Sequence, residues 1–426
     1  MAFMDKYIVP IAVKIGAQRH LVAVRDAFIA MIPVTMIGAF ATLINNLPSD
    51  GYKAFMANVF GEGWTQLGGD IWWGTIATMA LFVAVSVPYF LAKSYKEDGL
   101  QAGMISLCIF LLAAPQVGGE AWGNINWFYT GTSALFTAII IGLLSGEVYV
   151  KLSRIKQITI KMPDGVPPAV ARSFAKLIPG ILTILIFAIV SMLIRFAADG
   201  QFITDLINTY LAAPLRNVAD SLGGALSIAF FVHILWVFGL HGSNIALGIT
   251  KPLTMDLGSY NATLAQQGAT DGYHVMAGAF FDAFVYMGGA GLCIGLIIAL
   301  MIAGRRRKDM IALGTLPACF NINEPIIFGL PIVMNPVFMI PFILAPLVAT
   351  VVSYLAIQWG WVPPVIMPEI PWVTPPIFGG AMAVGHWSGG VLSFVNILIS
   401  VVIYLPFVAL SERIDLKRAQ EEASAK

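Results

Sequence analysis

Long apolar runs recur along the chain and constrain it to folds that lie within a lipid bilayer. Hydrophobic residues make up 58% of the 426 residues and charged residues only 11%, whereas a soluble domain averages about 25% charged residues. Each run is about as long as an α-helix that crosses a membrane. We therefore expect an all-α polytopic membrane protein rather than a soluble protein with a very large core. The runs lie near 27–46, 72–92, 100–117, 132–150, 177–197, 222–240, 278–303, 332–357 and 386–410.

The distribution of Lys and Arg predicts an orientation, because these residues are retained on the cytoplasmic side of a membrane. Twenty of the 24 basic residues lie in the N-terminus, 93–98, 151–176, 305–308 and the C-terminal tail. We place these segments inside. The exceptions are Lys53, Arg195, Arg216 and Lys251. The chain must then return to the outside between 241 and 277, so we expect a tenth crossing there and both termini in the cytoplasm.

Two polar segments are expected on the cytoplasmic surface. Charged residues interrupt Met1 to Arg25, which favours an amphipathic segment over a cleavable signal. The segment MPDGVPPAVARSFAKLIPG, Met162 to Gly180, combines turn residues with a stretch of mixed polarity. This pattern is typical of a helix at the membrane interface, and a docking surface for a soluble partner is the alternative.

Two stretches do not have the pattern of plain spanning helices. In FGLHGSNIALGI, Phe238 to Ile249, glycines flank His241 and Asn244 follows. In NINEPIIFGLPIVMNP, Glu324 is the only formally charged side chain between Met310 and Pro368. A carboxylate at mid-membrane costs about 2.5–3.5 kcal/mol, and Pro325 favours a helix N-terminus there. We expect Glu324 to face a cavity and bind substrate, the alternative being a helix cap.

Several other residues carry weaker signals. His241 by itself is as consistent with a structural histidine as with a functional one, and no histidine or cysteine has metal-ligand spacing. Cys108, Cys293 and Cys319 lie in or beside apolar runs, where packing is the expected role. Trp236 and Trp372 are either interfacial anchors or platforms for the apolar face of a sugar. Asp282 is costly in an apolar run, and the sequence does not indicate its partner.

Four segments together resemble the lactose/cellobiose branch of the phosphotransferase-system enzyme IIC (EIIC) permeases, which also includes the diacetylchitobiose permeases. They are RDAFIAMIPVTMIGA from Arg25, the Met162 to Gly180 segment, WVFGLHG ending at Gly242, and NINEPIIFGLPIVMNP, in the order of that family. The resemblance implies a homodimer in the bacterial cytoplasmic membrane, with ten spanning helices and two re-entrant hairpins per subunit. It also implies a dimer-interface domain over 1–215, with five spanning helices, and a sugar-binding transport domain over 216–426.

The resemblance also implies the chemistry. A β-linked disaccharide of the cellobiose or chitobiose class would be carried inward by an elevator-like movement, and a phosphocysteine donor would then phosphorylate it. His241 and Glu324 would lie beside the accepting hydroxyl, where Glu324 orients it or accepts its proton. No cofactor or metal is implied. The substrate-binding residues would be Trp236, His241, Gly242, Asn244, Asn323, Glu324 and Trp372.

The phosphoryl donor is expected on other polypeptides. No cysteine of this chain lies in a soluble domain, so the phosphocysteine protein EIIB and the phosphohistidine protein EIIA would be separate, with EIIB docking near 151–176 and 305–308. The chain would then be the permease subunit of a multi-component phosphotransferase. An ion-coupled sugar symporter is the main alternative, although such carriers usually embed several charged residues along an ion path. A channel is a more remote one.

Overall fold

The computed structural model describes most of the chain as helices. In the described part the helices are joined by turns and short 3₁₀ segments, and there is no β-strand. This confirms the all-α polytopic fold. Three of the predicted cytoplasmic segments lie partly outside the described residues. The residues that are not described are 1–13, 15 and 16 of the N-terminal segment, 162 and 164–173 of the predicted loop, and 305 and 306. The described residues are 14, 17–46, 50–116, 123–161, 163, 174–304, 307–330, 332, 333 and 335–424.

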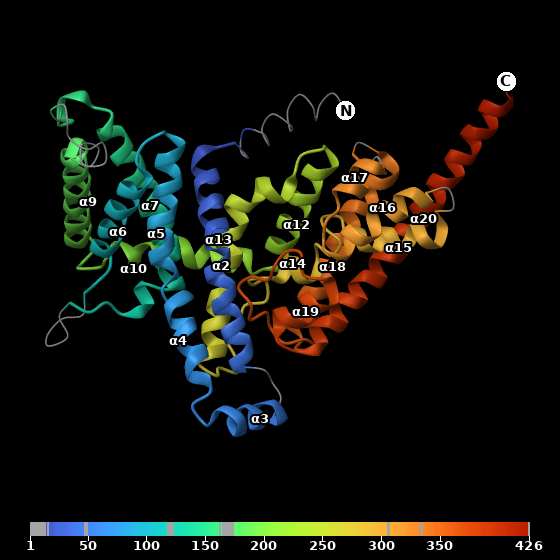
Figure 1. Ribbon diagram of the computed structural model, residues 1–426, viewed down its shortest axis with the longest axis horizontal. Coiled ribbons are helices and arrows are strands. Elements are labelled where there is room, and N and C mark those ends of the chain that lie inside the picture. The colour runs from blue at the N-terminus through green and yellow to red at the C-terminus, as the bar shows by residue number, and fades with distance from the viewer. Residues whose placement is uncertain are drawn as a thin grey trace.

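Within the described residues, the first half contains seven helices: α2 (Arg19–Asn46), α3 (Asp50–Phe60), α4 (Thr65–Thr75), α5 (Met79–Ser94), α6 (Gly99–Leu112), α7 (Leu135–Ser153) and α9 (Leu177–Ala197). Helices α5, α6, α7 and α9 lie on one side of the molecule, and α2 lies at its centre (Figure 1). Helices α5, α6 and α7 pack against one another, and α9 stands at the outer edge. Asp98 begins α6 by accepting a hydrogen bond from the backbone N–H of Gln101 at 3.1 Å.

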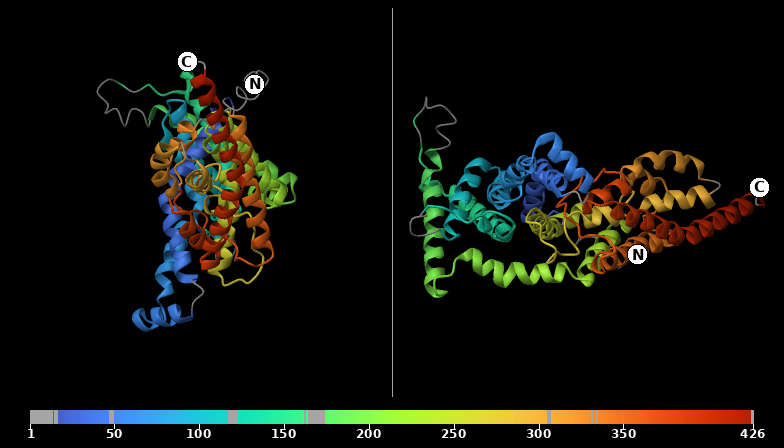
Figure 2. Two further views of the ribbon diagram at one scale, coloured as in Figure 1. Left: turned by 90° about the vertical axis from the view of Figure 1, so that its right-hand side faces the viewer. Right: turned by 90° about the horizontal axis from the view of Figure 1, so that it is seen from below.

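A helical segment crosses from α9 to the second half (Figure 2). It consists of α10 (Ile203–Ile207), a π-helical turn (Asn208–Ala212) and α11 (Ala213–Ala219), and it meets α12 (Leu222–Val237) at a bend of 75°. The remaining helices are α13 (Gly242–Gln266), α14 (Phe280–Phe284), α15 (Cys293–Ala303), α16 (Lys308–Cys319), α17 (Glu324–Gly329), α18 (Pro336–Gln358), α19 (Pro376–Val384) and α20 (Trp387–Ser424).

Within the described residues, six helical segments are long and apolar enough to cross a membrane, and the bent pair that ends in α12 makes a seventh. The remaining three of the ten expected crossings would fall on α6 and α15, which are shorter apolar helices, and on α13, which is more polar; none of these three has both the length and the hydropathy of the other segments. Helix α13 occupies the region in which we expected the tenth crossing. Its 25 residues extend about 37 Å.

The apolar run at 278–303 is not a continuous helix. Helix α14 ends at Phe284, and α15 begins only at Cys293. Between them Gly288, Gly289 and Gly291 have positive φ values of 75°, 87° and 83°, a backbone conformation that other residues rarely adopt. The glycines thus break the run and let the backbone line an interior space.

Helices α2 and α13 lie at the junction between the two halves (Figure 1). Met255 and Ala262 of α13 belong to the hydrophobic core of the first half, while Ala39 of α2 belongs to a core of the second half. The two halves therefore share buried surface along this pair of helices, on either side of the domain boundary that we expected at 215.

Segments that we expected on one side of the membrane contact one another. His20 at the start of α2 lies 2.9 Å from Glu147 of α7, and Glu97, after α5, pairs with Arg154 and Lys176. Arg307 binds Ser411 and Asp415 of α20 at 2.7 and 2.6 Å. The start of α2 and the end of α20 also lie at the same end of the molecule in Figure 1.

Two of the four basic residues that lie outside the predicted cytoplasmic segments form largely buried ion pairs. Arg216 of α11 forms a bidentate pair with Asp256 of α13 and donates to Asn208 Oδ1 at 2.9 Å. Lys251 of α13 pairs with Glu369. The charges of these side chains are neutralised inside the molecule. This explains why Arg216 and Lys251 do not follow the rule that Lys and Arg residues of loops lie on the cytoplasmic side.

Candidate functional site

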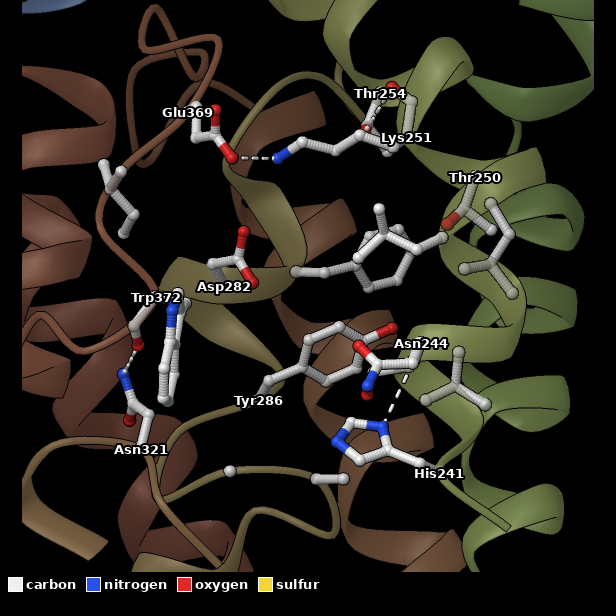
Figure 3. Close-up of a pocket in the computed structure, with 18 of the residues that line it drawn as sticks. His241, Asn244, Thr250, Lys251, Thr254, Asp282, Tyr286, Asn321, Glu369 and Trp372 are labelled. Carbon is white, nitrogen blue, oxygen red and sulfur yellow. Dashed lines mark hydrogen bonds and ion pairs between the residues drawn. The ribbon is translucent and has the colours of Figure 1, made fainter. Parts of the chain in front are cut away.

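A cavity of about 490 Å³ lies beside the α2–α13 junction, within the size range of small-molecule sites. Ile29 and Ile32 of α2 form part of its wall. The rest comes from the end of α12, the first three turns of α13, the 278–290 segment, the turn before α17 and the 369–372 loop. The predicted residues Trp236, His241, Asn244, Asn323, Glu324 and Trp372 all line this cavity, and Figure 3 shows three of them together.

His241 caps α13 with its ring. Its Nδ1 accepts a hydrogen bond from the backbone N–H of Asn244 at 3.2 Å, one of the N–H groups that a helix start leaves without an intrahelical partner. Because Nδ1 is an acceptor here, the proton of the neutral imidazole lies on Nε2. The cap thus fixes which nitrogen donates into the cavity.

Glu324 is the first residue of α17, and Pro325 follows it at the position that proline favours in a helix. Its Oε1 lies 3.9 Å from His241 Nε2, and both side chains are nearly half exposed to the cavity, at 46% and 43%. This distance is too long for a direct hydrogen bond. A hydroxyl oxygen can lie about 2.8 Å from both atoms at once, donating to Glu324 and accepting from His241.

Two asparagines hold the turn that carries Glu324. Asn323 is buried and donates to the backbone carbonyl of Ala290 at 2.9 Å. Asn321, in the left-handed region with φ of 61°, donates to the carbonyls of Trp372 and Thr374 at 2.7 and 2.8 Å (Figure 3). It also accepts from the Gly288 N–H at 2.8 Å. We predicted Asn323 as a site residue and missed Asn321, although both belong to the same motif.

The two tryptophans occupy different environments. Trp236 is 4% exposed, and its ring centroid lies 4.3 Å from that of His241, so it supports the imidazole from behind. Trp372 is 57% exposed, and its indole borders the open space in Figure 3. Of the two, Trp372 has the geometry of a sugar-stacking platform.

We predicted Gly242 as a substrate-binding residue, but it is buried beside His241 and does not line the cavity. A Cβ atom at this position would lie 2.0 Å from the carbonyl oxygen of Val232 in α12. The absence of a side chain therefore allows α12 and α13 to approach closely, which sets the position of the histidine that caps α13.

Gly242→Ala is expected to abolish sugar binding and to lower the unfolding midpoint in detergent. The new methyl group forces the two helices apart, and overpacking of this kind costs about 1–3 kcal/mol. Gly74→Ala in α4 is the matched control, because a Cβ there meets no atom within 4 Å and alanine favours a helix. Equal behaviour of the two variants would contradict the packing argument.

A second polar group lies in the same cavity, and most of its residues were not predicted from the sequence. Lys251 donates to Glu369 Oε1, and the hydroxyl of Thr35 in α2 donates to Glu369 Oε2 at 3.1 Å. Asp282 lies beside this pair (Figure 3). One signal was present, because Lys251 was an exception to the basic-residue pattern. Glu369 follows the stretch in which Glu324 stood alone.

The described residues do not bring three potential metal ligands together. The lining offers hydrogen-bonding groups, an exposed indole and charged side chains. Such a site suits a neutral polyhydroxylated molecule, which needs donors and acceptors around its rim and an aromatic face for its C–H groups.

The chain is similar to known membrane transport components over nearly its whole length. The family model described as "Phosphotransferase system, EIIC" matches residues 25–346. The cellobiose-specific EIIC component of Geobacillus stearothermophilus is 39% identical, over 99% of this chain and 95% of that protein. The lichenan permease IIC component of Bacillus subtilis strain 168 is 37% identical, over 98% and 95%.

A solved structure has the same fold. The crystal structure of the transporter ChbC, the IIC component from the N,N'-diacetylchitobiose-specific phosphotransferase system, matches with a TM-score of 0.92 and 37% identity. The match covers 98% of this chain and 99% of that chain.

Proposed function

The chain belongs to the EIIC family of the phosphotransferase system, and from this premise we propose that it imports a β-linked disaccharide and presents one hydroxyl for phosphorylation between His241 and Glu324. It is a multi-span membrane permease of a bacterial family, and this membership favours a phosphotransferase permease over the ion-coupled symporter. The observation that carries the site assignment is the 3.9 Å separation of the two polar groups inside the cavity.

The geometry supports phosphoryl transfer to a hydroxyl. Phosphoryl transfer depends on positioning of the nucleophile and on in-line approach of the donor. In the proposed step, the sugar hydroxyl oxygen attacks the phosphorus of a phosphocysteine on EIIB. The P–S bond breaks and leaves the thiolate on EIIB, and the hydroxyl proton passes to the Glu324 carboxylate. His241 donates from Nε2 to the same hydroxyl oxygen and fixes its direction.

The substrate class follows from the cavity and the relatives. Among the described lining residues, three are carboxylates and one is an ammonium group, which favours a neutral sugar over an anionic one. The exposed Trp372 supplies a ring face for stacking. Relatives are named for cellobiose, lichenan and diacetylchitobiose, so we propose a disaccharide of the cellobiose or chitobiose class.

The partners and the movement belong to the same proposal. We expect EIIA and EIIB as phosphate-carrying partners, with EIIB approaching from the cytoplasm. A homodimer and an elevator-like movement of 216–426 against 1–215 follow from the family resemblance alone. Cytoplasmic termini are consistent with the contacts between basic segments at one end of the molecule. The docking region proposed at 151–176 and 305–308 includes residues 162, 164–173, 305 and 306, which the structure does not describe.

The proposal is tested by sugar phosphorylation in vesicles. Vesicles that contain the protein, its EIIA and EIIB partners and a phosphoenolpyruvate-driven donor system would be offered labelled cellobiose, diacetylchitobiose and lactose. We expect sugar phosphate inside, formed only when EIIB is present. Accumulation of free sugar against a gradient without phosphate would instead support the symporter.

A further inference from the structure

Helix α3 (Asp50–Phe60) lies apart from the packed helices of the first half. It shares no extensive packing surface with any other helix in the described part of the chain. In Figure 1 it lies across the direction of α2, beyond the end of α2, and in the left view of Figure 2 the same blue segment projects sideways past the other helices.

The membrane spans on both sides fix the level of this helix. The segments Arg19–Asn45 and Thr65–Ser94 are both long and apolar enough to cross a membrane. From Phe60 to Thr65 five steps of extended chain cover at most about 18 Å, and the link from α2 is shorter. Helix α3 therefore lies at the membrane surface, at the end of the molecule opposite the start of α2.

The sequence of α3, DGYKAFMANVF, has one apolar face. Its five large apolar residues recur at the i, i+3, i+4, i+7 and i+8 spacing that places side chains on one side of a helix. They are Tyr52, Phe55, Met56, Val59 and Phe60. Phe55, Val59 and Phe60 are 61%, 55% and 66% exposed. A contiguous exposed apolar face of this kind marks a site of interaction with a membrane or a partner.

Tyr52 shows which way the apolar face is turned. Its hydroxyl donates to the carbonyl oxygen of Ile44, in the last turn of α2, at 3.1 Å. Its ring meets the ring of Trp64, just before α4, edge-on with centroids 5.7 Å apart. Because Tyr52 belongs to the apolar face, this face is turned toward the ends of the two spans and hence toward the bilayer.

The surroundings favour lipid as the occupant of this face. Ile44 of α2 and Leu67 and Trp73 of α4 are also exposed, at 45%, 71% and 51%, so apolar surface continues from α3 onto the spans. Helix α3 contains one acidic and one basic residue, Asp50 and Lys53, and therefore has no net charge that would attract a charged soluble partner. Tyrosine, tryptophan and phenylalanine side chains, which gather here, suit the boundary between membrane and water.

We propose that α3 is an in-plane amphipathic anchor whose apolar face inserts among the phospholipids of the leaflet at this end of the molecule. In the orientation predicted from Lys and Arg, this is the outer leaflet. The ligand is the boundary between headgroups and acyl chains, where such helices bury their apolar face about 5–10 Å deep. The anchor holds the first half at a fixed depth in the membrane. It does not line the sugar cavity, so this inference is independent of the proposed reaction.

The test measures the surroundings of each face of α3 in the full-length protein, in liposomes of phosphatidylethanolamine and phosphatidylglycerol. A nitroxide label would be attached to Phe55→Cys or Val59→Cys on the apolar face, and to Lys53→Cys or Asn58→Cys on the opposite face. Oxygen, which concentrates in lipid, and a water-soluble nickel chelate each relax the label where they reach it. We expect oxygen to dominate on the apolar face, at a depth of about 5–10 Å, and nickel to dominate on the opposite face.

The label is directed to α3 by the choice of background. Cys108 and Cys319 would be replaced by serine, whereas Cys293 is buried and stays in place. Sugar binding equal to that of the wild type is the check that each labelled protein is folded, because α3 contributes no residue to the cavity lining.

A matched pair of double variants tests which side chains hold the helix in the lipid, with the label placed on Met56→Cys of the apolar face. Phe55→Ser with Val59→Ser is expected to move this label into water, so that nickel relaxes it as strongly as it relaxes the labels of the opposite face. Ala54→Ser with Ala57→Ser, on the opposite face, is expected to leave the label at its depth. Equal depths in the two double variants would contradict the proposal.

Two results with the single labels would also overturn the anchor. Equal access of nickel to both faces of α3 would mean that the apolar face lies in water, where a soluble protein can cover it. Exclusion of both oxygen and nickel from positions 55 and 59, with dipolar broadening between labelled copies, would mean that a second copy of the chain covers this face instead of lipid.

Discussion

Glu324→Gln is expected to lower the rate of sugar phosphorylation by about 10²–10⁴-fold, the usual contribution of a general base, with little effect on sugar binding. Glutamine has the shape of glutamate and can still hydrogen-bond a hydroxyl, but it cannot accept the proton. The 3.9 Å gap to His241 would still admit the hydroxyl. The measurement is single-turnover transfer from phosphorylated EIIB to sugar in proteoliposomes, beside fluorescence binding of the same sugar.

Glu62→Gln is the matched control for this experiment. Glu62 is an exposed carboxylate before α4 and is not among the residues that line the cavity, so its variant should transfer phosphate at the wild-type rate. If Glu324→Gln kept full phosphorylation while sugar binding fell, Glu324 would orient or bind the sugar without acting as a base.

Asp256→Asn is expected to destabilise the protein by about 3–5 kcal/mol, because it breaks a buried ion pair and leaves Arg216 without its counter-charge. Asp256 is 1% exposed and Arg216 is largely buried. The pair joins α11 to α13, the helix that carries His241 and Lys251. The unfolding midpoint in detergent and the fraction that elutes as a single species would measure the loss.

A second variant separates the charge from the packing. Replacing both partners, as Arg216→Met with Asp256→Leu, should recover most of the stability, because apolar residues of similar volume often replace a buried pair without loss. Lys151→Gln serves as the surface control. Lys151 is 77% exposed and lies 3.6 Å from Glu147, so its removal should cost less than about 1 kcal/mol. An Asp256→Asn loss no larger than this would show that the buried pair contributes little.

The local features of the fold could be predicted from sequence. The run at 177–197 corresponds to α9 residue for residue, since an uninterrupted apolar stretch has one structure that satisfies its backbone in lipid. The start of α17 at Glu324 followed from Pro325, and the placement of Glu324 in a cavity followed from the cost of an isolated carboxylate. Each of these inferences needs only a few neighbouring residues.

Features that depend on distant partners could not be predicted. Asp282 was recognised as costly, but its neighbours Lys251 and Glu369 are separated from it by 31 and 87 positions along the chain. Asn321 resembles any polar turn residue until the structure shows that it joins three segments. The glycines after α14 read as part of an apolar run, because hydropathy does not report the sign of φ.

The hydrogen bond from Thr35 to Glu369 limits how far this permease is modular. Part of the cavity wall and one hydrogen-bond donor to its charged pair come from α2 in the first half, so residues 216–426 alone do not contain the complete binding surface. A chimera that grafts the second half of one relative onto the first half of another would combine two parts of one pocket from different sources. The set of sugars that the chimera binds should therefore depend on both parent proteins. Engineering of sugar specificity should include residues of α2 among the positions that are randomised.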